Sequence, residues 1–85
     1  MIYSTQLLRQ LRCTVGYNMH RLRARKRMPL RKLARLSDVP ERLIDQYELG
    51  KDEITLDAML KIACVLGVEV KALMDAPIAH PSEDA

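Results

Sequence analysis

Apolar residues in the first third of the chain recur at steps of three and four. This spacing places side chains on one face of a helix, and it predicts an amphipathic helix over residues 5–27. Gly16 interrupts the stripe, and glycine costs about 1 kcal/mol in a helix interior. The segment is therefore either one helix or two helices broken near residues 14–16, and we favour the break. The stripe consists of Leu8, Leu11, Val15, Met19 and Leu22.

Two short helical segments follow, each introduced by a proline. Proline suits the first turn of a helix, and it disfavours helical backbone in the residue before it. The predicted helices cover residues 29–36 and 40–49, with a turn at Ser37-Asp38 and a stop at Gly50. Their predicted inward side chains are Leu30, Leu33, Ala34, Val39, Ile44 and Tyr47.

Two further helices complete the pattern. Thr55 is predicted to cap a helix that Gly67 closes, and a short helix over residues 70–74 has Leu73 and Met74 to bury. Residues 76–85 are rich in proline and polar residues and are predicted to be disordered. No strand is predicted, so the fold class is all-α. The apolar pattern of the fourth helix comprises Leu56, Met59, Leu60, Ile62, Ala63 and Leu66.

Composition limits the chain to one domain with a modest aliphatic core. The sequence has 85 residues and neither Phe nor Trp, and a second copy could supply further buried surface. Cys13 and Cys64 form no CxxC motif and only two histidines are present, so no metal site is predicted. Both cysteines are predicted to be small buried apolar side chains.

Charge divides the chain into two parts. Residues 1–35 contain ten Lys or Arg and no acid, whereas residues 36–85 hold the other four bases and all eleven acids. This separation of charge has three possible consequences. The basic part attracts a polyanion, the basic part of one subunit pairs with the acidic part of another, or the charges neutralise each other within the fold. No apolar run approaches a membrane span and no secretory signal is visible, so we expect a cytoplasmic protein without a membrane partner.

Two short helices joined by a tight turn describe a helix-turn-helix over residues 28–50. The surrounding sequence resembles the phage-repressor or Cro-like family, also called the xenobiotic-response-element (XRE) family, over roughly residues 15–74. The motifs that carry this resemblance are Val15-Gly16, Met19, Leu22-Arg23, Met28-Pro29-Leu30-Arg31-Lys32-Leu33-Ala34, Val39-Pro40-Glu41-Arg42-Leu43-Ile44, Tyr47-Glu48-Leu49-Gly50-Lys51, Thr55-Leu56-Asp57-Ala58-Met59-Leu60-Lys61-Ile62-Ala63 and Leu66-Gly67-Val68.

The resemblance implies a compact five-helix DNA-binding domain over residues 15–75, preceded by a helical N-terminal extension over residues 1–14. It implies a structural salt bridge between Arg23 and Glu48. Arg42 suits guanine and Gln46 suits adenine. The base-reading positions map to Pro40, Glu41, Arg42, Asp45 and Gln46. The positions that contact the DNA backbone map to Arg31, Lys32, Arg35 and Lys51.

The implied function is a sequence-specific transcriptional regulator of the repressor or controller type. Helix 40–49 would enter the major groove of double-stranded DNA, with the protein as a homodimer on a palindromic site and without a cofactor. The first two helices are expected to supply most of the electrostatic attraction. Candidate dimer surfaces are the fourth and fifth helices or the N-terminal extension, with Ile2, Tyr3, Leu7 and Leu8.

A second interpretation stays open, because the recognition helix departs from the family pattern. Residues 40–48 hold one arginine against Glu41, Asp45 and Glu48, and Leu43 stands where a small polar residue is common. These features favour a protein-interaction module that has kept the fold and lost DNA readout. No nucleophile–base pair, phosphate loop or metal cluster is found, so we do not expect an enzyme.

Overall fold

The computed structural model describes residues 5–76, which form five helices and no strand. The order is α1 (Thr5–Arg25), α2 (Leu30–Ser37), α3 (Glu41–Glu48), α4 (Leu56–Leu66) and α5 (Val70–Met74). The all-α, five-helix prediction is confirmed. The first four residues of the predicted extension and residues 77–85 of the predicted disordered tail lie outside the described residues.

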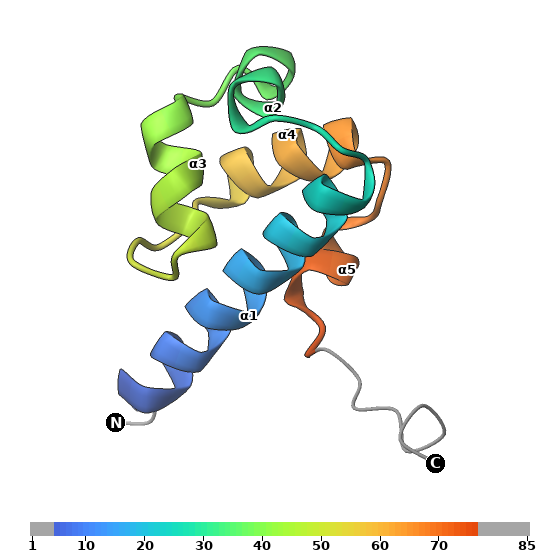
Figure 1. Cartoon of the computed structure of the whole chain (residues 1–85). Helices are drawn as coiled ribbons and strands as arrows, with labels where there is room; N and C mark the ends of the chain where they lie inside the picture. The colour runs from blue at the N-terminus through green and yellow to red at the C-terminus, as the bar shows by residue number, and fades with distance from the viewer. Residues whose placement is uncertain (1–4, 77–85) are drawn as a thin grey trace.

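The long helix α1 crosses the molecule, and the other four helices lie along its C-terminal half (Figure 1). It contacts α3 and α5, while α2 packs on α3 and α4, and α4 on α5. The core draws on all five helices and is aliphatic apart from Tyr47, as the composition predicted. Its buried members are Val15, Met19, Leu33, Val39, Ile44, Tyr47, Ala58, Met59, Ile62, Ala63, Leu66 and Leu73.

Gly16 lies inside a continuous helix, so the predicted break in α1 is wrong. A Cβ atom at this position would overlap the carbonyl oxygen of Tyr47 and lie 2.8 Å from the carbonyl oxygen of Glu48. Glycine is therefore required because the backbone of α3 approaches α1 without room for a side chain. The packing of the two helices offsets the intrinsic cost of glycine in a helix.

The predicted turns and caps are present. Asp38 adopts left-handed backbone with φ 59° after α2, and Gly50 and Gly67 do so after α3 and α4, with φ 70° and 73°. The Thr55 hydroxyl accepts the Ala58 amide at 3.1 Å, which caps α4. Pro29 and Pro40 occupy the N-cap positions, one residue before the helices begin.

Several side chains that the apolar pattern assigned to the core are on the surface. Cys13 and Cys64 are both exposed, so their predicted burial is wrong. Met74 is 43% exposed, although it too was predicted to be buried. The N-terminal turns of α1 extend beyond the other helices (Figure 1), and Leu8 and Leu11 are 39% and 41% exposed. The stripe on α1 therefore continues past the elements that could cover it.

Asn18 is a buried polar residue that the sequence analysis did not select. It lies on the packed face of α1 and is 1% exposed. Its side-chain amide donates to the carbonyl oxygens of Leu73 and Asp75, both at 2.8 Å. These carbonyls belong to the end of α5, where helical partners are lacking. Asn18 thus joins the last helix to the first.

None of the helices in residues 5–76 is long and apolar enough to cross a membrane. The same part of the chain holds no group of three or more His, Cys, Asp or Glu side chains that could bind a metal ion.

Candidate nucleic-acid interface

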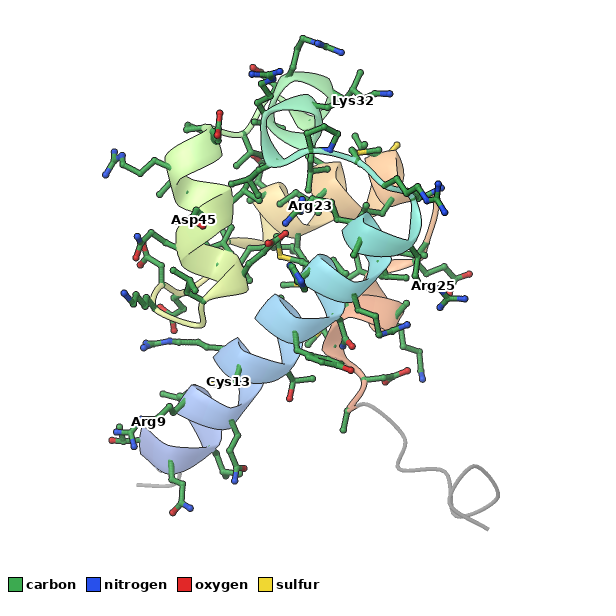
Figure 2. The ribbon with its side chains drawn as sticks, viewed as in Figure 1. Arg9, Cys13, Arg23, Arg25, Lys32 and Asp45 are labelled. Atoms are coloured by element: carbon green, nitrogen blue, oxygen red, sulfur yellow. The ribbon has the colours of Figure 1, made fainter. Side chains whose placement is uncertain are left out.

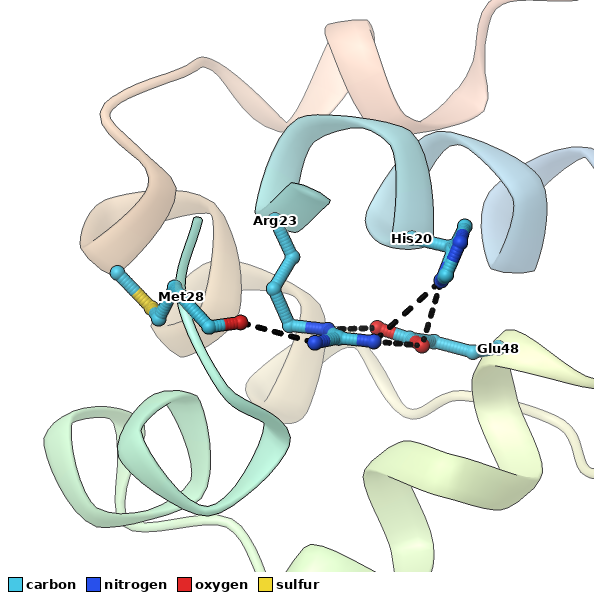
Figure 3. A network of polar contacts seen from close by, with 4 residues as sticks. All are labelled: His20, Arg23, Met28 and Glu48. Carbon is cyan, nitrogen blue, oxygen red and sulfur yellow. Dashed lines mark hydrogen bonds and ion pairs between the residues drawn. The ribbon is translucent and has the colours of Figure 1, made fainter. Parts of the chain in front are cut away.

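The end of α3 is fixed to α1 by a charged pair. The guanidinium of Arg23 donates from Nε to Oε2 of Glu48 at 2.7 Å and from Nη2 to Oε1 at 2.9 Å. Its Nη1 donates to the carbonyl oxygen of Met28 at 2.8 Å (Figure 3). The side chains are only 15% and 7% exposed. Two parallel charge-assisted hydrogen bonds fix both the position and the orientation of the Glu48 carboxylate. The pair therefore holds the end of α3 in a defined orientation relative to α1.

This pair also changes the acid–base behaviour of Arg23. Its hydrogen bonds to the Glu48 carboxylate raise the pKa of Arg23 above its usual value, although burial alone acts in the opposite direction. The guanidinium therefore stays charged at neutral pH, as its paired hydrogen bonds to a carboxylate require.

His20 completes the network, and the sequence analysis missed it. Its Nδ1 lies 3.3 Å from Oε1 of Glu48 and 3.3 Å from Nη2 of Arg23 (Figure 3). The ring accepts from Arg23 when Nδ1 is bare and donates to Glu48 when Nδ1 carries hydrogen. The available signal was its position three residues before Arg23, which places both side chains on one face of α1.

Tyr47 lies on the buried side of α3 and belongs to the core. It is 5% exposed, and burial raises the pKa of its phenol, with a smaller contribution from the negative charge of Asp52. Ile44 lies one turn earlier and is fully buried. The buried face of α3 is thus held by apolar packing along its length and by Glu48 at its end.

The opposite face of α3 is open to solvent. Pro40, Glu41, Arg42 and Asp45 are exposed and Gln46 is half-buried. None of these side chains forms a hydrogen bond or ion pair within residues 5–76. Leu43, which stands where a small polar residue is common in the family, is half-buried and packs against the core. The face therefore presents one cation between two carboxylates.

The predicted phosphate-binding residues also have free charges. Arg31, Lys32 and Arg35 are exposed on α2, and Lys51 is exposed in the loop after α3. None of the four is ion-paired in the described part of the chain. A shallow groove runs between the end of α2 and the start of α3, with Arg35 on one side and Glu41 on the other. It brings the predicted backbone-binding and base-reading sets next to each other.

Some of the basic residues lie away from α3. Figure 2 shows Arg25, near the end of α1, on the side of the molecule away from α3, which carries Asp45. Lys26 and Arg27 follow in the exposed turn between α1 and α2. The ten basic residues of the first 35 are therefore divided between different sides of the molecule. The helix α3 shares its side of the molecule with only some of them.

Comparison with known proteins identifies a common architecture. A family model described as helix-turn-helix matches residues 19–73. The hypothetical transcription factor NHTF from Neisseria is 30% identical, with a TM-score of 0.75 over 79% of this chain and 77% of that one. No curated protein matches the sequence.

Two further solved structures are similar at lower identity. The restriction-modification controller protein C.AhdI from Aeromonas hydrophila is 27% identical, with a TM-score of 0.71 over 73% of this chain and 94% of that one. The clp gene regulator ClgR from Corynebacterium glutamicum is 28% identical, with a TM-score of 0.71 over 74% of this chain and 67% of that one. The chain thus shares its fold with regulators that differ from one another in their described roles.

Proposed function

We propose a function from the premise that this chain belongs to the helix-turn-helix family, HTH_3, whose model matches residues 19–73. The protein is a DNA-binding transcriptional regulator that inserts α3 into the major groove. One observation carries the proposal: α3 is anchored by its buried face and by Glu48, while the side chains of its solvent face form no hydrogen bond or ion pair within residues 5–76. A helix held in this way fits the width of the major groove with its side chains free to meet base edges.

Individual roles follow from side-chain chemistry. Arg42 offers two parallel donors to guanine, and Gln46 offers a donor and an acceptor to adenine. Arg31, Lys32, Arg35 and Lys51 neutralise phosphates on either side of the groove. Glu41 and Asp45 repel phosphate and can accept from the cytosine amino group, so they exclude sequences as much as they select them.

The regulator acts as a homodimer on a palindromic site. One short helix reads too few base pairs to find a site among the many that compete with it. Two copies related by a two-fold axis would place their α3 helices in successive major grooves, about 34–36 Å apart. Whether such a dimer represses or activates depends on where its site lies relative to a promoter.

Salt dependence of binding to random duplex DNA tests the electrostatic part of the proposal. Affinity should fall steeply with salt, and Arg35→Ala should lower the slope by about one counterion relative to the parent. Arg25→Ala is the matched control, because Arg25 lies on the far side of the molecule and should leave the slope unchanged. Equal effects of the two variants would show that net charge alone matters, and undetectable binding at low salt would remove the DNA role.

Base reading is tested with Arg42→Ala on a site obtained by selection from random duplexes. Loss of a bidentate contact should weaken specific binding by about 1–3 kcal/mol and leave random DNA almost unaffected. Equal losses on both substrates would reassign Arg42 to phosphate binding.

A second candidate is a protein-interaction module, favoured by the charge of the open face. Glu41 and Asp45 flank the only basic side chain of α3, and Leu49 beyond it is 56% exposed. This mixture of acids and an exposed leucine suits a basic protein surface as well as it suits DNA. Absence of DNA binding at low salt by a folded chain is the result that favours this candidate.

A further inference from the structure

An apolar groove lies beside the N-terminal half of α1. The floor is formed by side chains that α1, α4, α5 and the loop before α4 contribute. We call it the α1 groove. Its lining residues are Leu8, Leu11, Arg12, Val15, Glu53, Ile54, Met59 and Met74.

The fold leaves this groove only partly covered. Leu8, Leu11 and Met74 are 39%, 41% and 43% exposed, and no residue of the range 5–14 is fully buried. Large apolar side chains gathered on one surface, next to charged ones, are typical of a protein contact. An occupant would remove these side chains from water, which is favourable at about 25 cal/mol for each Å² of apolar area.

The edge of the groove lacks a polar partner. Nε of Arg12 is buried and has no hydrogen-bond acceptor within residues 5–76. The same side chain reaches Glu53 only at 3.9 Å, from Nη2 to Oε2, which is longer than a hydrogen bond. A buried donor without an acceptor costs about 1–3 kcal/mol. The Arg12 guanidinium is therefore incompletely paired at this edge of the groove.

We propose that a second copy of this chain occupies the groove. The inference names a surface for the proposed dimer and to that extent rests on the proposed function. The patch is self-complementary, as a two-fold interface requires. Arg12 lines it from α1, where the exposed Arg9 lies one turn earlier, and Glu53 lines it from the loop, next to the exposed Asp52. A two-fold axis through the groove brings the basic helix of each copy to the acidic loop of the other.

Sedimentation equilibrium of the full chain over a range of concentrations tests the surface. Leu11→Asp places a charge in the groove and should raise the dimer dissociation constant by about 100-fold or more. Leu60→Asp is the matched control: Leu60 is 52% exposed on α4, outside the groove, and its dimer should be unchanged. Circular dichroism verifies that both variants are folded, and Leu8→Asp repeats the test at a second position.

Charge exchange provides an independent test of the pairing. Arg9→Glu and Glu53→Arg should each weaken the dimer by about 10-fold, and the double variant should recover most of the loss because opposite charges again face each other. Arg25→Glu changes net charge equally and should weaken the dimer less. Additive losses in the double variant would remove the proposed contact between copies.

Failure of the inference is distinguishable from failure of the proposed function. A parent chain that stays monomeric at the highest concentrations, or a dimer that Leu60→Asp dissociates and Leu11→Asp does not, overturns the α1 groove. DNA binding with a steep salt dependence in either case would leave the regulator proposal in place. A dimer that Leu11→Asp dissociates, without any affinity for DNA, would support the groove and overturn the regulator.

Discussion

The two halves of α1 have the same periodic pattern and different surroundings. The C-terminal half contributes Val15, Gly16, Asn18 and Met19 to the buried interior, and Arg23 to the pair with Glu48. The N-terminal half continues the leucine stripe without one fully buried residue among positions 5–14. Hydrophobic periodicity thus defines which face of a helix is apolar, whereas other elements decide how much of that face is covered.

Gly16→Ala should have the largest effect on stability, because it acts where α1 and α3 are closest. The added methyl group would overlap the backbone of Tyr47 and Glu48, which cannot rotate away as a side chain can. We expect a loss of more than about 3 kcal/mol in the free energy of unfolding, measured by urea denaturation. Gln10→Ala, in the exposed half, is the control and should be nearly neutral. A stabilised Gly16→Ala variant would mean that the two helices are not in close contact.

Glu48→Ala should follow, with a loss of about 3 kcal/mol, because it leaves the guanidinium of Arg23 buried without its carboxylate. His20→Ala removes the exposed member of the network and should cost much less. Thermal and urea unfolding of both variants measure this difference. Equal losses would mean that the network as a whole, and not the bidentate pair, holds α3 to α1.

Leu11→Ala should cost about 1 kcal/mol or less in the monomer, since the side chain is already 41% exposed. Met19 lies on the same stripe but is 0% exposed. Met19→Ala should therefore lower the free energy of unfolding about as much as Gly16→Ala or Glu48→Ala does. Unfolding must be measured at concentrations below the dissociation constant of the proposed dimer. At higher concentrations the proposal predicts that the cost of Leu11→Ala grows, because a dimer contributes to stability by mass action. A cost that is independent of concentration would separate Leu11 from any interface.

The smallest expected effect is alkaline destabilisation through Tyr47. Burial raises the pKa of its phenol above the usual value of 10.0, so above pH 10 the unfolded chain loses this proton while the folded chain keeps it. The contribution of Tyr47 to the free energy of unfolding is therefore fully present below pH 10 and decreases as the pH rises further. The loss should be less than about 1 kcal/mol at pH 10.5. Tyr47→Phe should remove this part of the dependence, and an unchanged pH profile would show that the phenol is accessible to water.

Much of the fold could be predicted because local signals were strong. Pro29 and Pro40 before the short helices, Asp38 in the left-handed turn, the Thr55 cap and Gly67 all act within a few residues. Gly16 was misread for the opposite reason. Its partner atoms belong to Tyr47 and Glu48, about thirty residues along the chain, so its role depends on tertiary contact that helix propensity does not contain.

The same distinction explains the errors on the surface and in the candidate site. Cys13 and Cys64 are apolar enough for a core but are exposed on their helices. The role of Asn18 depends on the end of α5, which lies 55 residues away. The family resemblance was enough to select Arg42 and Gln46 as candidates. The separation of Arg25 from α3 could be seen only in the folded structure.

The open face of α3 has a consequence for how such a protein can change. Among residues 5–76 the side chains of Glu41, Arg42 and Asp45 form no hydrogen bond or ion pair, while Ile44, Tyr47 and Glu48 hold the helix in place. Substitutions on the open face are therefore nearly neutral for folding. New binding preferences can be acquired there one residue at a time, by natural variation or in the laboratory, without the scaffold having to adapt.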